Sequence, residues 1–412
     1  MLGTYVMNDV NFEDIETAAA VLAGHVIETP TIPAPLLSQT CECSLFLKLE
    51  NIQYTSSFKA RGAYLAIERL SKEERARGVI TMSAGNHAQA VAFSATKVGV
   101  KSTIYMPEQT PFSKISRTQN FGGDVILKGR SLNECEPEVA KQIEAHGYTL
   151  VHPYDNRDVI CGQGTAGLEI MQAVPDLDCL VIPIGGGGLF SGIAIAAKAI
   201  NPHIKIYGVE AALYPSMSQA ISGETNSCGG ETLAEGIAVK SPGALTRPIV
   251  EAYAEAILLV DEVALEWAVG ALSEQQRIIA EGAGAAGIAA IYSHKSLFRG
   301  KRVGTVICGG NIDTRLLGSI LTRNMVSDGR LARLRVEISD EPGMLASIAG
   351  AISDEGGNVV EVYHQRLFYN VPAKLAKIDV VVDTRGKEHV VRIIEALQAR
   401  GFLVSQLDEH SG

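Results

Sequence analysis

Residues 179–190 read CLVIPIGGGGLF. Six mostly apolar residues, typical of a buried strand, are followed directly by four glycines, and an apolar helical pattern begins at Leu189. Without Cβ atoms, residues 185–188 can turn their N–H groups toward one anion, and the start of a helix adds partial positive charge. The run matches neither the dinucleotide fingerprint nor a P-loop. We therefore predict a phosphate-binding turn here, with a plain tight turn as the alternative.

On both sides of this turn, short β-branched runs alternate with longer alanine-rich helical runs up to about residue 320. That order predicts a parallel sheet with helices on both faces, which is an α/β architecture. After residue 330 the pattern changes to alternating strands and two helices in the order βαββαβ. This order is typical of the ferredoxin-like unit and predicts a separate C-terminal module.

Composition and charge limit the function classes. The 412 residues carry 36 Lys plus Arg against 46 Asp plus Glu, a formal net charge of -10, which disfavours nucleic acid as a partner. The 7 cysteines form no CxxC pair, so we predict neither a disulfide framework nor a metal site. The sequence shows no apolar run long enough for a membrane span and no secretory signal in residues 1–11. We expect a cytoplasmic protein that does not bind membranes.

Lys59 lies in the stretch SSFKARG at or just before the start of a helical run. A helix start and partial burial both disfavour a charged ammonium group, so we expect the pKa of Lys59 to be lowered. A neutral lysine amine is a nucleophile that forms Schiff bases with carbonyl compounds. A solvated surface lysine is the alternative when this stretch is taken alone.

Two further turns follow predicted strands. Residues 83–87, SAGNH, bring a hydroxyl and amide groups to the start of a helix, where a substrate carboxylate could bind or where Ser83 or Asn86 could simply cap the helix. Cys308 ends another strand, and the two glycines after it allow a ligand close to the backbone. A buried structural cysteine is the alternative at that position.

In identity and order these four motifs resemble those of the fold-type II pyridoxal-phosphate enzymes, specifically the threonine and serine dehydratases, over nearly all of residues 10–320. Residues 154–155, 162–169, 232–236 and 281–284 are also similar to that family. The resemblance implies a tryptophan synthase β-like, two-subdomain catalytic unit over residues 1–322. Its smaller subdomain, at about 48–152, would be inserted in the larger one.

The resemblance also implies roles for individual residues. Lys59 would carry pyridoxal 5'-phosphate and act as the catalytic base, and Phe58 would pack on the cofactor ring. Asn86 would hydrogen-bond its phenolic oxygen, and Cys308 would face its pyridine nitrogen. The residues expected to bind the cofactor are then Phe58, Lys59, Asn86, Gly185, Gly186, Gly187, Gly188 and Cys308. The substrate carboxylate would bind Ser83, Asn86 and His87, and a monovalent cation could lie near the Gly/Glu loops.

The reaction expected from this resemblance is that of a carbon–nitrogen lyase, which removes water from L-threonine and yields 2-oxobutanoate and ammonia. L-Serine, giving pyruvate, would be a secondary substrate. Serine racemase is similar over the same region, but racemisation needs a second acid/base opposite Lys59, and this chain has Ala84 where the racemase-like pattern has serine. A hydroxyaspartate dehydratase is another alternative. So is an amino-acid sensor that keeps the cofactor scaffold without useful turnover.

The C-terminal module, residues 332–410, resembles an ACT domain, a small regulatory fold that binds amino acids, after a linker at 323–331. The resemblance rests on residues 340–345, on Ile348 and Ile352, and on the stretch from 357 that leads to His364 and Arg366. A tight turn before a helix could bind an effector carboxylate. The residues expected to do so are Pro342, Gly343, Met344 and Asn358.

The ACT resemblance implies regulation by an amino acid, isoleucine or valine, in isoleucine biosynthesis or in threonine catabolism. ACT modules usually pair edge to edge, which protects exposed strand edges and would make the protein a homodimer or a homotetramer. A purely dimerising module without an effector is the alternative.

Overall fold

A computed structural model describes residues 10–339, 341–365 and 375–407. The chain divides into two compact units, residues 1–312 and 313–412. The first unit contains all four motifs discussed above, and the second contains the predicted C-terminal module. No helix in the described ranges combines the length and the apolar character needed to cross a bilayer.

The first unit is built on a six-stranded sheet in the order β1-β2-β10-β7-β8-β9. All neighbouring strands are parallel except β1, which pairs antiparallel with β2. Strands β7 and β8 are almost completely buried, as expected for parallel strands that are covered on both faces. The strands are β1 (Thr31–Pro33), β2 (Ser44–Lys48), β7 (Cys179–Pro183), β8 (Lys205–Ala211), β9 (Ala256–Val260) and β10 (Arg302–Val306).

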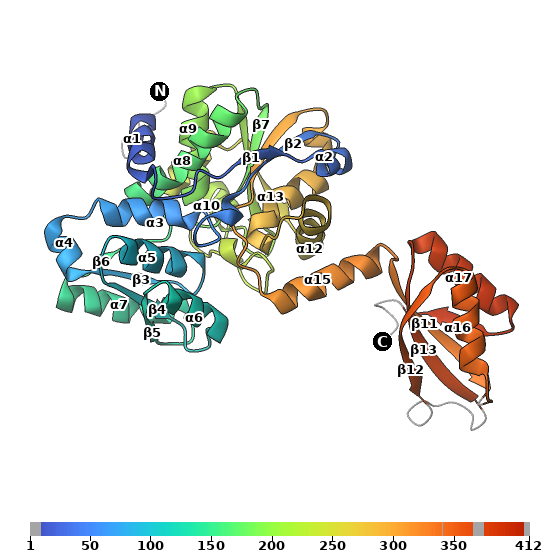
Figure 1. Cartoon of the computed structure of the whole chain (residues 1–412). Coiled ribbons are helices and arrows are strands. Elements are labelled where there is room, and N and C mark those ends of the chain that lie inside the picture. Colours follow the sequence, from blue (N-terminus) through green and yellow to red (C-terminus); the bar gives the residue numbers. More distant parts are fainter. Residues whose placement is uncertain (1–9, 340, 366–374, 408–412) are drawn as a thin grey trace. The chain divides into compact units, whose positions relative to one another are not determined.

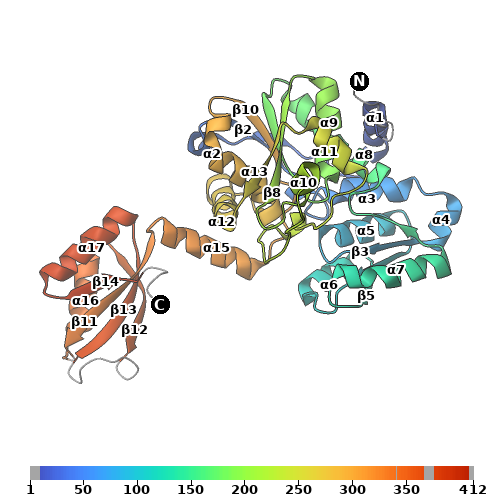
Figure 2. The same cartoon turned by 180° about the vertical axis from the view of Figure 1, so that it is seen from behind.

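Helices α8 and α9 cover one face of this sheet, and α12 and α13 cover the other (Figures 1 and 2). Helices α8 and α9 approach closely because both carry glycine: a Cβ at Gly192 would lie 2.5 Å from the backbone nitrogen of Gly164. The helices of this layer are α1 (Phe12–Leu22), α2 (Pro35–Cys41), α8 (Arg157–Ala173), α9 (Gly188–Ile200), α10 (Ser216–Ser222), α11 (Thr246–Tyr253), α12 (Glu262–Ala271), α13 (Gly282–Ser293) and α14 (Lys295–Phe298). Shorter helical turns are η1 (Glu50–Ile52), η2 (Glu235–Ile237) and η3 (Leu272–Gln276).

A second, smaller layer within the same unit contains a parallel sheet in the order β5-β4-β3-β6. Because side chains alternate along a strand, Tyr105 packs on Val139 of α7, whereas Ile104 packs on Ala92 of α5. The strands are β3 (Val79–Met82), β4 (Ser102–Met106), β5 (Asp124–Leu127) and β6 (Thr149–Leu150). The helices are α3 (Lys59–Glu68), α4 (Lys72–Arg77), α5 (Asn86–Lys97), α6 (Phe112–Asn120) and α7 (Leu132–His146). The α/β architecture predicted from the sequence is confirmed.

The second unit contains an antiparallel sheet in the order β12-β13-β11-β14. Along the chain its elements run β11 (Leu331–Ser339), α16 (Met344–Asp354), β12 (Asn358–Gln365), β13 (Leu375–Asp383), α17 (Lys387–Ala399) and β14 (Leu403–Gln406), which is the predicted βαββαβ order. Helix α15 (Thr314–Ser327) belongs to this unit and covers the first residues of the segment 323–331, which was expected to be a linker. Asp340, Arg366 and residues 408–410 of the predicted module lie outside the described residues.

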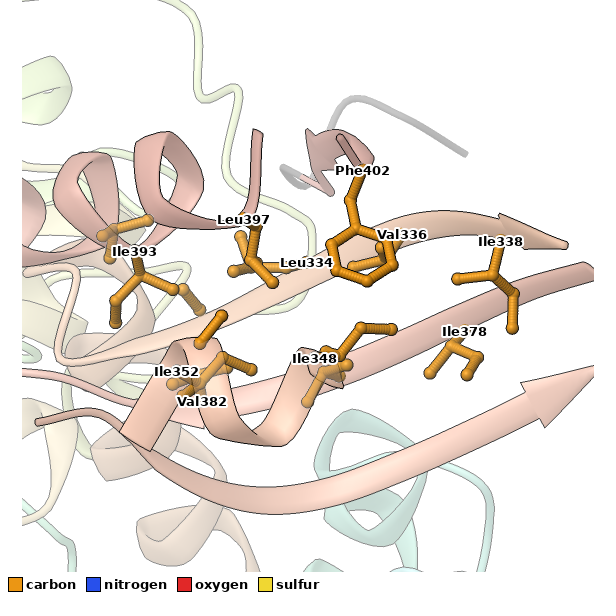
Figure 3. Close-up of a cluster of buried hydrophobic side chains, with 14 of the residues drawn as sticks. Leu334, Val336, Ile338, Ile348, Ile352, Ile378, Val382, Ile393, Leu397 and Phe402 are labelled. Carbon is orange, nitrogen blue, oxygen red and sulfur yellow. The ribbon is translucent and has the colours of Figure 1, made fainter. Parts of the chain in front are cut away.

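The core of the second unit lies between its sheet and helices α16 and α17. Figure 3 shows Leu334, Val336 and Ile378 of the sheet directed toward Ile348 of α16 and Ile393 of α17. All five side chains are buried. The strict alternation of apolar residues in β11 therefore marks the face that the helices cover.

We predict that Ile393→Ala destabilises the second unit by about 2–5 kcal/mol, because it leaves a cavity at a fully buried position. The loss of stability should appear as faster hydrogen exchange in the β11 and β13 peptides of the full-length protein, measured by mass spectrometry. Val391→Ala on the same helix is the matched control, since Val391 is 53% exposed and its truncation should change little. Equal exchange rates in the two variants would contradict the proposed core.

Candidate active site

Lys59 is the first residue of α3, and backbone pairing determines its position. The N–H of Phe58 donates to the carbonyl oxygen of Cys308 at 3.1 Å. The same two segments, 56–58 and 308–310, share a second hydrogen bond of 2.9 Å and an isolated β-bridge. The loop before α3 is thus joined to the turn after β10, and the Lys59 and Cys308 motifs predicted from the sequence lie side by side.

A buried ionic cluster anchors the first turn of α3. The guanidinium group of Arg61 is fully buried and donates to Glu50 at 2.8 and 2.9 Å and to Glu169 at 2.5 and 2.7 Å. Lys48 also pairs with Glu169, and Thr29 donates to Glu50. Removing one partner from such a cluster leaves an uncompensated buried charge and typically costs about 3–5 kcal/mol. The cluster therefore holds the helix start that carries Lys59.

The Lys59 amine has a lowered pKa, as predicted. Burial lowers the pKa of Lys59 to about 8, while the nearby Cys308 and Glu281 act in the opposite direction. Its Nζ donates a hydrogen bond of 2.6 Å to the carbonyl oxygen of Pro153. A substantial fraction of this amine is therefore neutral near pH 8 and able to attack a carbonyl carbon.

The glycine run forms a cradle that side chains would fill. Gly187 has φ +96° and caps the start of α9, a conformation that favours glycine. A Cβ at Gly186 would lie 2.2 Å from the Tyr154 ring, and one at Gly187 would lie 2.7 Å from Thr246. Within the described chain, the N–H groups of Gly185 and the next two glycines donate to no protein acceptor. These donors, together with the N-terminus of α9, fit a phosphate group.

The SAGNH turn leads into α5, whose first residue is Asn86. The Asn86 amide Nδ2 donates to Glu281 Oε1 at 2.7 Å, and its Oδ1 accepts from Asn311 Nδ2 at 2.8 Å. In the preceding loop, Ser83 Oγ accepts a hydrogen bond from the N–H of Gly85 at 3.3 Å. The turn of the smaller layer therefore contacts the end of the larger sheet.

His87 is buried, and its side chain is not placed to bind an anion. Its Nε2 lies 2.8 Å from the carbonyl oxygen of Val151, which fits a donor at that nitrogen. Burial, with a further contribution from the positive charge of Lys59, lowers the pKa of His87 to about 3. The imidazole is therefore neutral at physiological pH. His87 can still bind an anion through its backbone N–H, which lies in the first turn of α5.

Cys308 lies two residues after the end of β10 and is buried. Its Sγ donates to the carbonyl oxygen of Ala283 at 3.3 Å, and burial raises the pKa of the thiol far above its usual range. The group next to Lys59 is therefore a neutral thiol, not a thiolate.

Three further residues of the site had no role predicted from the sequence: Glu281 and Tyr154 lie in family-like stretches, and Asn311 follows the two glycines after Cys308. Glu281 bonds Asn86, and burial raises the pKa of the Glu281 carboxyl group to about 7. Tyr154 packs against the glycine run, and Asn311 bonds Asn86. Each has a local signal, since it stands beside a glycine-rich or family-like stretch, but its partner lies far away along the chain.

Comparison with protein-family models identifies both units. Residues 22–309 match the model described as "Pyridoxal-phosphate dependent enzyme", and residues 332–401 match the ACT domain. The first match contains Lys59, the glycine run and the turns at Asn86 and Cys308.

Individual relatives agree with these matches. The chain is 41% identical over 397 residues to the L-threonine ammonia-lyase of Thermotoga maritima, which covers 96% of this chain and 99% of that protein. The solved structure of threonine deaminase isoform 2 from Solanum lycopersicum is 34% identical with a TM-score of 0.72 and covers 76% of this chain and 87% of that one. The solved structure of maize serine racemase is 32% identical with a TM-score of 0.72, and the match covers 77% of this chain and 99% of that one.

The lowered pKa of Lys59 gives a pH prediction for the apo-protein. Below about pH 8 the amine is mostly protonated, so the rate of reconstitution with pyridoxal phosphate should rise about tenfold per pH unit and then level off above pH 8. Stopped-flow absorption measures this rate. In Glu281→Gln the inflection should move to lower pH, because the Glu281 charge raises the pKa of Lys59. An inflection near 10.5, the ordinary value for lysine, would contradict the buried amine.

Proposed function

Because the chain belongs to the family of pyridoxal-phosphate-dependent enzymes, we propose that it is a threonine ammonia-lyase, which converts L-threonine to 2-oxobutanoate and ammonia. The observation that carries this proposal is that the Lys59 amine, the glycine cradle and the Asn86 turn share neighbours. Lys59 bonds Pro153, and the next residue, Tyr154, packs on the glycine run. Glu281 lies near both Lys59 and Asn86, in a chain 41% identical to a relative with that activity. L-Serine, which would give pyruvate, is the secondary substrate.

The residues of the site fit the cofactor. The N–H groups of the glycine run and the start of α9 would hold its phosphate, and Phe58 would pack on its ring. When bound, pyridoxal phosphate withdraws electrons from the substrate α-carbon. Cys308 is a neutral thiol and, beside the pyridine nitrogen, would not hold a proton there as a carboxylate would, so the bound cofactor would withdraw electrons less strongly and elimination would be favoured over transamination.

Lys59 is the base of the proposed reaction. Its Nζ, whose pKa burial lowers to about 8, takes the proton from the substrate α-carbon. The substrate carboxylate binds where α5 begins, at Ser83, Asn86 and the backbone N–H of His87. These contacts would orient the α-carbon hydrogen toward Lys59.

Racemisation is disfavoured by the residue at position 84. A racemase needs a second acid/base on the face of the α-carbon opposite Lys59. Ala84 carries a methyl group, and it packs against the apolar cluster of Ala88 and Met106. It cannot transfer a proton, so any racemase activity should be minor.

We predict that Lys59→Arg lowers threonine turnover by about 10²–10⁴-fold or more, because the guanidinium group stays protonated and cannot act as the base. The assay is 2-oxobutanoate formation, with borohydride reduction and peptide mapping to show which lysine carries the cofactor. Lys101→Arg is the matched control, since the Lys101 side chain is 65% exposed.

Relative kcat/KM for L-threonine, L-serine and 3-hydroxyaspartate then separates the threonine enzyme from a hydroxyaspartate dehydratase. Bound cofactor without turnover of any of the three would instead support an amino-acid sensor. Near-native activity of Lys59→Arg would overturn the proposed mechanism.

The second unit is proposed to regulate the enzyme by binding isoleucine or valine. Gly343, with φ +96°, turns the chain into α16, and Asn358 begins β12. An effector carboxylate would bind the free N–H groups at the start of α16, beside Pro342 and Met344. Strand β12 is an edge of the sheet with exposed apolar side chains such as Val360, which supports pairing into a homodimer or homotetramer.

The setting of the enzyme is proposed on chemical grounds. All seven cysteines are free thiols and six of them are buried, which agrees with a reducing, cytoplasmic compartment. 2-Oxobutanoate production with isoleucine feedback would serve isoleucine biosynthesis, whereas production without feedback would serve threonine catabolism.

Isoleucine should change the threonine concentration at half-saturation by about 5- to 150-fold, the range expected for ordinary coupling free energies. Asn358→Ala should weaken the response without changing turnover in the absence of effector, and Val391→Ala on the outer face of α17 should leave it intact. Saturation curves with and without isoleucine, then with valine, test this. Identical threonine saturation curves in all conditions would indicate that the second unit is a purely structural module.

A further inference from the structure

The Asn86 side chain is held at both ends. Its Oδ1 accepts from Asn311 Nδ2 at 2.8 Å, and its Nδ2 donates to Glu281 Oε1 at 2.7 Å. A carboxamide has one acceptor oxygen and two N–H donors. If this amide were flipped, its Nδ2 would meet the Nδ2 of Asn311, and both hydrogen bonds would be lost. The two neighbours therefore fix which atom of Asn86 points which way.

Asn311 can impose this orientation because its own orientation is fixed. Its Nδ2 donates both to Asn86 Oδ1 and to the carbonyl oxygen of Thr55 at 2.9 Å, a backbone group that can only accept. Its Oδ1 accepts from Arg117 Nη1 at 3.4 Å. An Arg guanidinium can only donate, so both ends of Asn311 are determined by partners that cannot exchange roles.

These contacts use one of the two Nδ2–H groups of Asn86 and leave the other available. We propose that Asn311 is a positioning residue: by donating to Asn86 Oδ1 it keeps the second Nδ2–H of Asn86 as a donor for the phenolic oxygen of the cofactor. This inference rests on the proposed function for the role of Asn86. Glu281 completes the arrangement by accepting the first Nδ2–H.

The consequence is electrostatic. A hydrogen bond donated to the phenolic oxygen stabilises its anionic form, so losing the donor favours the neutral phenol, which absorbs at shorter wavelength. Asn311 also lines an open pocket with Gln89 and Arg117, so a substitution there does not require the protein core to repack.

The test is the absorption of the bound cofactor in Asn311→Asp and Asn311→Ala holoenzymes. Aspartate has nearly the same size but offers only acceptors to Asn86 Oδ1, and alanine removes the donor without adding charge. In both variants the spectrum should shift to shorter wavelength at a given pH. The pH of the transition should rise by about one unit, a tenfold change in the ratio of the two forms.

Asn51→Asp is the matched control. Asn51 Nδ2 donates to the carbonyl oxygen of Ile279 at 3.1 Å, so the same substitution removes a donor in the same region without touching Asn86. Its spectrum should match that of the native enzyme. Native spectra in both Asn311 variants, or an equal shift in Asn51→Asp, would overturn the positioning role. If Asn311→Asp fails to fold, the alanine variant decides by the same criterion.

Borohydride reduction of the same samples tests the positioning role and the proposed function separately. Cofactor on the Lys59 peptide with a native spectrum in the Asn311 variants would reject only the positioning role. Cofactor on another peptide would reject the proposed function itself.

Discussion

The arrangement of the site depends on a short stretch of backbone pairing between residues 56–58 and 308–310. This pairing joins the residue before Lys59 to the end of β10, although some 250 positions separate them. The glycine at 309 leaves room for the side chains beside this pairing, since a Cβ there would lie 2.2 Å from Glu281 Oε1 and 3.0 Å from the Asn86 amide nitrogen. One missing side chain thus allows the lysine, the carboxyl group and the amide to meet.

Burial then sets the charge of the titratable groups around Lys59. Loss of solvent lowers the pKa of Lys59 to about 8 and that of His87 to about 3, and it raises the pKa of Glu281 to about 7. The Cys308 thiol stays neutral for the same reason. Near neutral pH, then, the Lys59 amine and the Glu281 carboxyl group both change protonation state within about one pH unit, while His87 and Cys308 stay neutral. A reaction that moves one proton to and from a carbon atom benefits from such groups.

The sequence predicted those features whose physical cause is local. The strand before the glycine run, the helix after it and the alternation in β11 all follow from periodicity within a few residues. The lowered pKa of Lys59 was also predicted, but its main cause is burial, which only the fold supplies. Long-range partners were not predictable, because nothing near Arg61 indicates that its guanidinium will lie between Glu50 and Glu169.

His87 and Asn311 show most directly why residue type does not determine role. A histidine beside a turn proposed to bind substrate has the right chemistry to bind a carboxylate, yet its ring donates to Val151 and is too deeply buried to become charged. Asn311, an ordinary residue after two glycines, acquires its importance only because Thr55 and Arg117 fix its orientation. Asn86 belongs to the smaller layer, whereas Glu281 and Asn311 belong to the larger one. The proposed donor toward the cofactor would therefore keep its orientation only while the two layers stay packed together. The chemical competence of the site is therefore a property of how the two layers are packed together, which no single motif contains.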